Sequence, residues 1–369
     1  MVSSETYMDL AIKLSLKAKG LTLSNPLVGA VVVRNNRVIS SGYHRGIGKD
    51  HAEVVALKKA GKKANGATLY VTLEPCSTYG RTPPCTDSIV KSGIKKVVFG
   101  LSDPNPRHNG RAVGILRKQG IEVEPGILKD KIRQINQPFI KYISKNKPYI
   151  TVKIAQSLDG KIATSSGESK WITSVKSREL SHKLRNNYSA IMVGINTVLK
   201  DDPLLNPTDL SKKNKFYKII LDTNLKINRG MRIFKDSLDF PVIIATSRKS
   251  ILNKSDKIKL LQKNGVMFLG LETEKGLIGL EDLLNKLALL QISSIFVEGG
   301  GTLIGSLCDK KLVDYVYFFI SPKIIGGRSS ISSIQGEGVS RLKDTLELRN
   351  VMTKKLDKDL LIEGAIHNY

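Results

Sequence analysis

The sequence is poor in cysteine, tryptophan and long apolar runs. Its 369 residues include three cysteines, Cys76, Cys85 and Cys308, and one tryptophan, Trp171. Three thiols cannot build the disulfide framework of a small secreted protein, and they fit a reducing compartment. No apolar run approaches the ~20 residues that span a bilayer, and the first twenty residues lack the apolar core of a secretory signal. We therefore expect a cytoplasmic protein with no membrane partner.

Acidic residues are also scarce, with 33 Asp and Glu against 59 Lys and Arg, which gives a net charge of +26. A strong basic excess can indicate a nucleic-acid binder. Here, however, residues 1–146 carry 24 basic and 10 acidic side chains and residues 147–369 carry 35 and 23, without a dense cluster or a basic tail. The dispersed excess favours compositional drift over a nucleic-acid groove, and it is compatible with an anionic small-molecule substrate.

Chain length and local pattern predict two α/β domains, because a domain takes ~100–200 residues and strand-like runs alternate with helix-like runs. The polar stretch 144–148 separates a domain of residues 1–146 from one of residues 147–369. In the first, we expect strands at 28–33, 37–41, 68–73, 95–100 and 121–124, helices at 51–60, 84–92 and 112–119, and a helical connector over 126–147. In the second, we expect a helix near 176–186 and strands at 149–155, 190–193, 218–221, 242–245, 295–297 and 313–321.

The strongest chemical signal is a set of potential zinc ligands. His51-Ala52-Glu53 is followed by Thr72-Leu73-Glu74-Pro75-Cys76 and, after eight intervening residues, by Cys85. One imidazole and two thiolates suit a tetrahedral zinc whose fourth position holds water, and Glu53 is close enough to carry protons without ligating. The order His-x-Glu, then Pro-Cys, is typical of zinc nucleobase deaminases, although their two cysteines are separated by two residues. A closed structural zinc site would need a fourth ligand, for which His44 is the candidate in this segment.

These residues resemble the family of bifunctional riboflavin-biosynthesis deaminase/reductases. The similarity includes Asn25-Pro26, His51-Ala52-Glu53, the run from Thr72 through Ser77 to Cys85, and Asp103-Pro104-Asn105-Pro106. It implies a cytidine-deaminase-like three-layer α/β/α domain that holds one zinc through His51, Cys76 and Cys85, with Glu53 as the catalytic proton carrier. It also implies that Asn25, His44 and Arg81 contact the substrate.

The second half resembles the reductase of the same family, whose fold is like dihydrofolate reductase. The segment 153–163 and the runs Ser169–Thr173, Asp201-Asp202-Pro203 and Val297–Gly300 carry this similarity. Glycines after an apolar strand and before a helix start allow close backbone approach to a phosphate. The resemblance implies an NADPH site at Ala155, Trp171, Thr197, Asp201, Thr223, Gly300, Gly301, Thr302, Leu303, Ile304, Gly305 and Ser306. It implies substrate contacts at Ser169, Arg185, Leu205 and Glu298.

Three positions depart from the family pattern. Thr78 stands where the family commonly has histidine. The family usually continues Asn-Pro with a valine and two glycines, whereas residues 107–112 read Arg-His-Asn-Gly-Arg-Ala. Thr208 stands where an arginine usually holds the substrate phosphate.

The sequence thus predicts a riboflavin-biosynthesis enzyme acting on a phosphorylated pyrimidine. Zinc-dependent deamination of 2,5-diamino-6-ribosylamino-4(3H)-pyrimidinone 5′-phosphate would precede NADPH reduction of its ribosyl group to ribityl. We expect a homo-oligomer and no nucleic-acid partner. One alternative is a tRNA-adenosine-type deaminase with a basic accessory domain, and another is a zinc-stabilised scaffold without activity.

Overall fold

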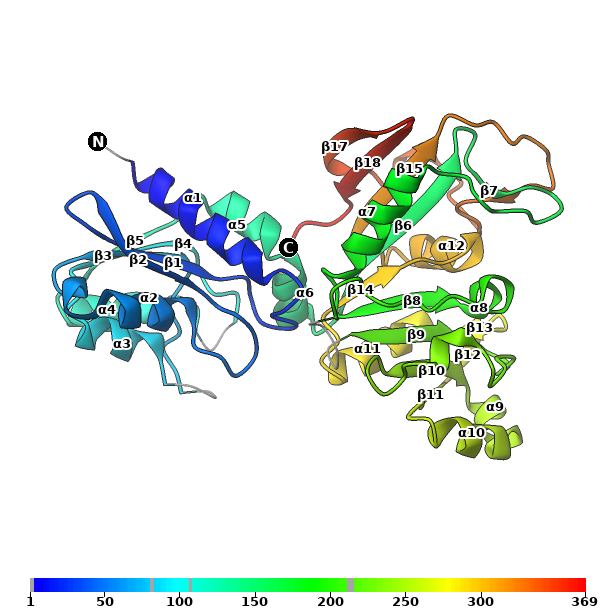
Figure 1. Cartoon of the computed structure of the whole chain (residues 1–369), viewed down its shortest axis with the longest axis horizontal. Coiled ribbons are helices and arrows are strands. Elements are labelled where there is room, and N and C mark those ends of the chain that lie inside the picture. The colour runs from blue at the N-terminus through cyan, green and yellow to red at the C-terminus, as the bar shows by residue number, and fades with distance from the viewer. Residues whose placement is uncertain (1–2, 80–82, 106–107, 211–215) are drawn as a thin grey trace. The chain divides into compact units, whose positions relative to one another are not determined.

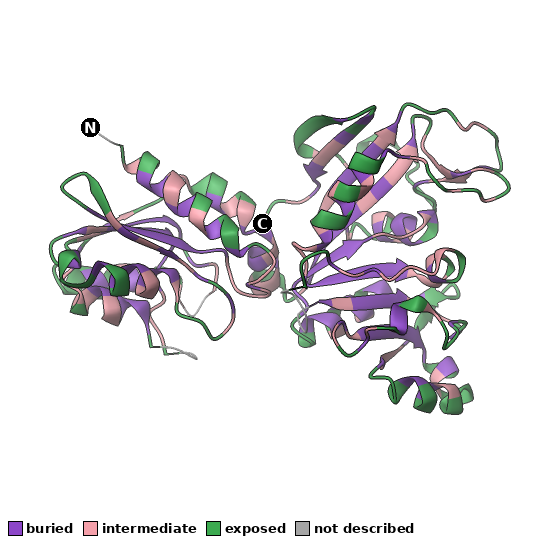
Figure 2. Ribbon diagram, in the orientation of Figure 1, coloured by how far each residue is buried: buried purple, intermediate pink, exposed green. Residues whose placement is uncertain are grey.

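The chain forms two units, each with its own sheet and apolar core. The structure is a computed structural model that describes residues 3–79, 83–105, 108–210 and 216–369. One unit comprises Met1–Asn146 together with Tyr369, and the other comprises Lys147–Asn368. Figure 2 shows that the central strands of both sheets are buried, whereas the edge strand β17 and the outer faces of the helices are exposed.

The first unit is built on a five-stranded sheet of order β2-β1-β3-β4-β5. Strand β1 pairs antiparallel with β2 and β3, and β4 and β5 continue parallel to β3. The strands are β1 (Gly29–Arg34), β2 (Arg37–Tyr43), β3 (Thr68–Leu73), β4 (Lys96–Leu101) and β5 (Glu122–Pro125). The expected strands are confirmed to within two residues, and the β-branched apolar runs of β1, β3 and β4 fill the buried centre of the sheet.

Helices cover both faces of this sheet and give the expected three layers (Figure 1). Helices α1 (Ser4–Ser15) and α5 (Lys129–Ile135) lie on one face, and α2 (Ala52–Ala60), α3 (Cys85–Lys91) and α4 (Arg111–Lys118) lie on the other. Helix α2 ends as predicted at Gly61, whose φ of 53° favours glycine. The connector folds as two helices, α5 and α6 (Gln137–Lys145), and α1 was not predicted.

The second unit has a nine-stranded sheet of order β11-β10-β9-β8-β14-β6-β15-β18-β17. Neighbouring strands are parallel from β11 to β15, and the β17–β18 hairpin adds antiparallel to β15. The strands are β6 (Tyr149–Ser157), β8 (Ala190–Gly194), β9 (Tyr217–Leu221), β10 (Val242–Ser247), β11 (Met267–Leu271), β14 (Ser294–Val297), β15 (Tyr315–Ser321), β17 (Arg349–Leu356) and β18 (Asp359–Ala365). Two further sheets have two strands each: β12 (Thr273–Glu274) and β13 (Leu277–Ile278) form a hairpin, whereas β7 (Lys161–Ala163) pairs with the distant β16 (Ile331–Ser332).

Alternate residues of the central strands supply two separate apolar layers. On β10, Ile243 and Ala245 belong to one buried cluster, whereas Val242 and Ile244 belong to another. This alternation follows from the period of two of a strand, and it requires cover on both faces. The helices of this unit are α7 (Val175–Arg185), α8 (Ile195–Asp201), α9 (Arg248–Asn253), α10 (Ser255–Gln262), α11 (Leu280–Leu289) and α12 (Gly301–Asp309). Within the described ranges, no helix combines the length and apolar character needed to cross a bilayer.

Candidate metal centre and cofactor cavity

The three predicted zinc ligands come together in the first unit. His51 has extended backbone immediately before α2, and its carbonyl accepts the Val55 N–H at 3.0 Å, which starts the helix. Cys76 follows β3, and Cys85 is the first residue of α3. We expected both cysteines near helix starts. Cys76 begins no helix, but its sulfur accepts the Cys85 backbone N–H at 3.2 Å, so it lies at the amino end of α3.

The geometry of these side chains fits zinc. The candidate ligand atoms of His51, Cys76 and Cys85 all lie within 4.8 Å of one another. Nδ1 of His51 is 3.2 Å from Sγ of Cys85 and 3.5 Å from Sγ of Cys76. Two sulfurs and one imidazole nitrogen are the donors of a three-ligand zinc site that keeps a fourth position open. Within the described residues, no further His, Cys, Asp or Glu joins this cluster, which disfavours a closed structural site.

The contacts among these side chains shift the pKa values of Cys76 and His51. A hydrogen bond from the Cys85 side chain lowers the pKa of Cys76 to about 4, which favours the thiolate. The hydrogen bond with Cys76 raises the pKa of His51 to about 9. Cys76 therefore favours the thiolate, the form of cysteine that ligates zinc, whereas His51 favours its protonated form and must release a proton when a metal binds.

Glu53 lies in the first turn of α2 and faces the cavity next to the ligands. The residue is 3 % exposed, and burial raises the pKa of its carboxyl group. A carboxyl group with a raised pKa exchanges protons more readily near neutral pH, as a general acid–base residue must. Glu53 therefore has the position and the environment that the sequence predicted for a proton carrier.

Asn25 and His44 form one wall of this cavity, whose volume is about 270 Å³. The Asn25 amide nitrogen is 3.0 Å from Nε2 of His44, and Nδ1 of His44 is 3.2 Å from the Asp50 carbonyl oxygen. Since a carbonyl only accepts, Nδ1 carries the proton and Nε2 accepts from Asn25. Burial lowers the pKa of His44, which keeps the imidazole neutral. Arg81, the third predicted substrate contact, lies outside the described residues.

Several cavity residues were not singled out by the sequence analysis, and Glu74 organises them. Its carboxylate accepts the backbone N–H groups of Asp103, Gly110 and Ala112 at 3.2, 3.0 and 3.2 Å. These bonds tie the segment after β4 and the start of α4 to the strand that delivers Cys76. Asp103, Asn105 and His108 from this segment line the cavity, together with Tyr142 of α6. The sequence feature that could have pointed to these cavity residues is Glu74, which directly precedes Pro75-Cys76.

A second cavity, of about 260 Å³, lies in the other unit at the carboxyl ends of β8, β9 and β14. Open α/β sheets bind ligands at this edge, and the amino end of α12 offers free N–H groups to phosphate. Six predicted cofactor residues line it: Thr197, Thr223, Gly300, Thr302, Leu303 and Ser306. Hydroxyl groups, backbone N–H groups and apolar side chains together fit a nucleotide cofactor. Asn196, Asn224 and Lys226 also line this cavity and were missed.

The other six predicted cofactor residues lie elsewhere in the unit. Ile304 is buried in the apolar core, and a Cβ at Gly301 or Gly305 would lie 2.4 or 1.5 Å from the carbonyl oxygens of Ser332 and Gln335. Close packing of α12 therefore accounts for these two glycines. The remaining three are Ala155 on β6, Asp201 at the end of α8, and Trp171, which is 62 % exposed and has the Arg178 guanidinium 4.4 Å from its ring centroid.

Two of the predicted substrate residues, Arg185 and Glu298, are paired, whereas Leu205 is buried in the apolar core. The Arg185 guanidinium donates to Glu298 from Nε at 2.6 Å and from Nη2 at 3.2 Å, and from Nη1 to the Asn206 carbonyl, next to Leu205, at 3.3 Å. Burial opposes ionisation of Glu298, but the Arg185 and Lys153 charges outweigh it and lower its pKa to about 2. Arg185, which was predicted to contact the substrate, therefore pairs with Glu298 in this structure.

Two further positions, Ser169 and Thr208, precede α7 and follow α8 along the chain. Ser169, the fourth predicted substrate contact, is half-buried between β7 and α7. Thr208, which replaces an arginine of the family pattern, accepts the Asn186 side-chain N–H at 2.6 Å and donates its backbone N–H to the same side chain at 2.9 Å. The segment after Asp202-Pro203 is thus held by side-chain contacts at 206 and 208.

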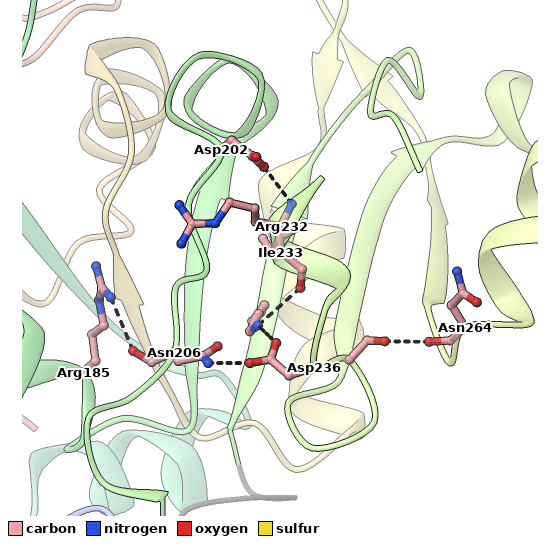
Figure 3. Close-up of polar contacts among 9 residues, drawn as sticks. Arg185, Asp202, Asn206, Arg232, Ile233, Asp236 and Asn264 are labelled. Atoms are coloured by element: carbon pink, nitrogen blue, oxygen red, sulfur yellow. Dashed lines mark hydrogen bonds and ion pairs between the residues drawn. The ribbon is translucent and has the colours of Figure 1, made fainter. Parts of the chain in front are cut away.

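Behind this segment lies a buried ion pair that the sequence did not reveal (Figure 3). The Lys218 side chain on β9 is 0 % exposed, and its Nζ donates to Asp236 at 2.7 Å and to the Ile233 carbonyl at 3.3 Å. The side-chain amide of Asn206 donates to the other oxygen of Asp236. Asn206 therefore connects the Arg185 cluster to the buried pair.

The folds and sites define a class of protein: a zinc-dependent deaminase with a cytidine-deaminase-like fold, joined to a reductase that resembles dihydrofolate reductase. Comparison with known proteins agrees. Residues 1–101 match the cytidine and deoxycytidylate deaminase zinc-binding region, and residues 148–362 match the RibD C-terminal domain.

Full-length relatives narrow the class to one family. The chain is 43 % identical over 358 residues to riboflavin biosynthesis protein RibD of Aquifex aeolicus, covering 97 % of each chain, and 38 % identical to that of Escherichia coli, covering 88 % and 89 %. The crystal structure of Acinetobacter baumannii RibD superposes with a TM-score of 0.87 at 34 % identity, covering 98 % of both chains. The chain belongs to the RibD family of bifunctional deaminase/reductases of riboflavin biosynthesis.

Membership confirms the resemblance, both predicted fold types, the two enzyme classes, and zinc and NADPH as cofactors. The tRNA-adenosine-type deaminase is not favoured, because the relatives match both halves of the chain.

Proposed function

We propose that residues 1–146 deaminate 2,5-diamino-6-ribosylamino-4(3H)-pyrimidinone 5′-phosphate and that residues 147–369 then reduce its ribosyl group to ribityl with NADPH. A structural relative from Thermotoga maritima, 37 % identical with a TM-score of 0.84 over 98 % of each chain, is named as a deaminase and reductase of this kind. The observation that carries the proposal is the clustering of His51, Cys76 and Cys85 beside a cavity that the buried Glu53 also lines.

In the deaminase cavity, the chain's own residues orient the pyrimidine and move protons. Zinc held by the three ligands would lower the pKa of a coordinated water toward ~7 and so supply the nucleophile. Glu53 would take protons from the attacking water and deliver them first to the pyrimidine ring and then to the departing ammonia. Its buried carboxyl group, with a raised pKa, suits this transfer. Asn25 and the neutral His44 would hold the ring edge, since their mutual hydrogen bond fixes both side chains.

In the reductase, binding and orientation are the main contribution of the protein. NADPH supplies the hydride. The α12 amino end, Thr197 and Thr223 would hold the cofactor in the 260 Å³ cavity. The Arg185–Glu298 pair would form the neighbouring substrate surface. Because Arg185 is already paired, substrate phosphate would have to exchange with Glu298 or bind beside it.

The test is to incubate zinc-loaded protein with the diamino substrate and NADPH while following ammonia and nicotinamide absorbance. We expect ammonia release followed by NADPH loss. Glu53→Gln should lower deamination by about 10²–10⁴-fold and leave reduction of supplied deaminated product unchanged. Arg185→Ala should raise the KM of reduction and leave deamination unchanged. Ammonia release that survives Glu53→Gln would refute the assignment.

We also propose a cytoplasmic location, a single zinc per chain and a homo-oligomer. A reducing compartment keeps the two ligand cysteines as thiols. Strand β17 is the edge of the nine-stranded sheet and residues 349–355 are exposed, which offers an unpaired edge to a second copy. Light scattering of the purified protein measures the oligomeric state, and a monomer would refute this part of the proposal.

A further inference from the structure

Two residues that depart from the family pattern meet at the wall of the deaminase cavity. Thr78 stands where the family commonly has histidine, and His108 lies in the altered segment after Asn105-Pro106. Although 30 residues separate them, Oγ1 of Thr78 is 3.5 Å from Nδ1 of His108. The histidine missing at position 78 is therefore matched by the imidazole of His108, which comes from a different segment of the chain.

The backbone around His108 is fixed by hydrogen bonds. Its N–H donates to the Asn105 carbonyl at 2.9 Å, and the Asn105 N–H donates to Oδ1 of Asp103 at 2.9 Å. Glu74 holds both flanks of this segment through Asp103 and Gly110. The imidazole is thus presented at the cavity wall by a segment anchored to β3.

The charges of the cavity single out this imidazole for an anion. Its described lining contains the carboxyl groups of Glu53, Glu74 and Asp103, which disfavour phosphate. His51 is a zinc ligand, and both ring nitrogens of His44 are already engaged, Nε2 by the Asn25 amide and Nδ1 by the Asp50 carbonyl oxygen. Among the described lining residues, His108 is then the one basic side chain left to face an anion.

We propose that His108 contacts the ribosyl phosphate of the deaminase substrate and so determines the preference of this site for phosphorylated pyrimidines. The inference rests on the proposed function, because the phosphate belongs to the proposed substrate. With the Thr78 hydroxyl beside Nδ1, Nε2 is the nitrogen available to donate to a phosphate oxygen. A hydrogen bond to an ionised phosphate oxygen is charge-assisted and is among the stronger hydrogen bonds in proteins.

The experiment compares deamination of the phosphorylated substrate with that of the same compound lacking phosphate. In the wild type, the phosphorylated substrate should have the higher kcat/KM. His108→Val should reduce this preference about ten- to a hundredfold, mainly through KM and with the unphosphorylated compound little affected. Adding Thr78→His to that variant should restore the preference. Asn109→Ala, an exposed neighbour outside the cavity lining, should behave as wild type.

A second measurement separates this inference from the proposed function. The chain has five histidines, so ¹⁵N-histidine labelling gives few resonances, and His108→Val assigns one of them. Ribose 5-phosphate should shift the His108 resonance even without turnover. A preference unchanged by His108→Val, an equal loss with both substrates, or an unmoved resonance would overturn the inference. Absence of deamination by the wild type, with a shifted resonance, would instead refute the proposed function.

Discussion

Asp236→Ala should destabilise the reductase unit strongly, because it leaves the buried Lys218 ammonium without its anionic partner (Figure 3). The substitution removes the acceptor 2.7 Å from Nζ of Lys218 and the partner of the Asn206 amide. Lys218 is 0 % exposed and would keep only the Ile233 carbonyl and the face of the Phe240 ring, 5.6 Å from Nζ. Burial already lowers the pKa of Lys218 with Asp236 in place, so the lysine would lose its proton more readily without it.

The expected cost can be placed within a range. Removing one member of a buried pair costs about 3–5 kcal/mol. Because the Asp236 side chain is 24 % exposed, water can partly replace it, and we take the lower value of about 3 kcal/mol. For a unit of this size, one kcal/mol corresponds to about 2–4 °C, so its melting temperature should fall by about 6–12 °C.

Differential scanning calorimetry of the full chain measures this effect. Lys218→Met combined with Asp236→Leu replaces the pair by apolar groups and should recover most of the loss, except that Asn206 still lacks its partner. The KM of reduction should rise in Asp236→Ala, since Asn206 also accepts from Arg185, while deamination stays unchanged. A melting temperature within about 2 °C of wild type would refute the reasoning.

Three further outcomes test other parts of the structure. Glu298 has its pKa lowered to about 2 in the folded state against about 4.3 unfolded. Its stabilisation is therefore present above pH ~4.3 and lost as the pH falls toward 2, so the melting-temperature difference between wild type and Glu298→Gln should shrink over that range in acid-melting curves. Glu74→Ala frees three backbone N–H groups and should lower deamination at least tenfold by the ammonia assay, whereas unchanged deamination would contradict its positioning role. Removal of zinc with a chelator should abolish ammonia release yet spare reduction of supplied deaminated product, and loss of both would contradict separate sites.

Local pattern was sufficient wherever residues close in sequence decide the structure. The run 68–73 was predicted as a strand and forms β3 over the same residues, because its β-branched and apolar side chains suit a sheet covered on both faces. The zinc ligands were equally readable, since few side chains ligate zinc and their spacing is distinctive.

The sequence was insufficient where the signal was weak or depended on distant contacts. Strand β17 was missed, because it is an exposed edge with no apolar alternation and its sequence resembles a loop until β18 pairs with it. The substrate contact of Arg185 stays a prediction, but its ion pair with Glu298, 113 residues away, could not be read from the sequence. The close approach of residues 332–336 to Gly301 and Gly305 is likewise a tertiary contact.

By itself, the sequence was enough to predict the α/β class of both halves, the clustering of His51, Cys76 and Cys85, and Glu53 as the candidate proton carrier, because hydrophobic period and ligand chemistry are local properties. Only the tertiary structure decided which side chains share a cavity. Three contacts join residues from different elements: Thr78 with His108, the Glu74 carboxylate with the Gly110 N–H, and Lys218 with Asp236. Such contacts depend on how the sheet brings loop ends together, which no spacing along the chain specifies.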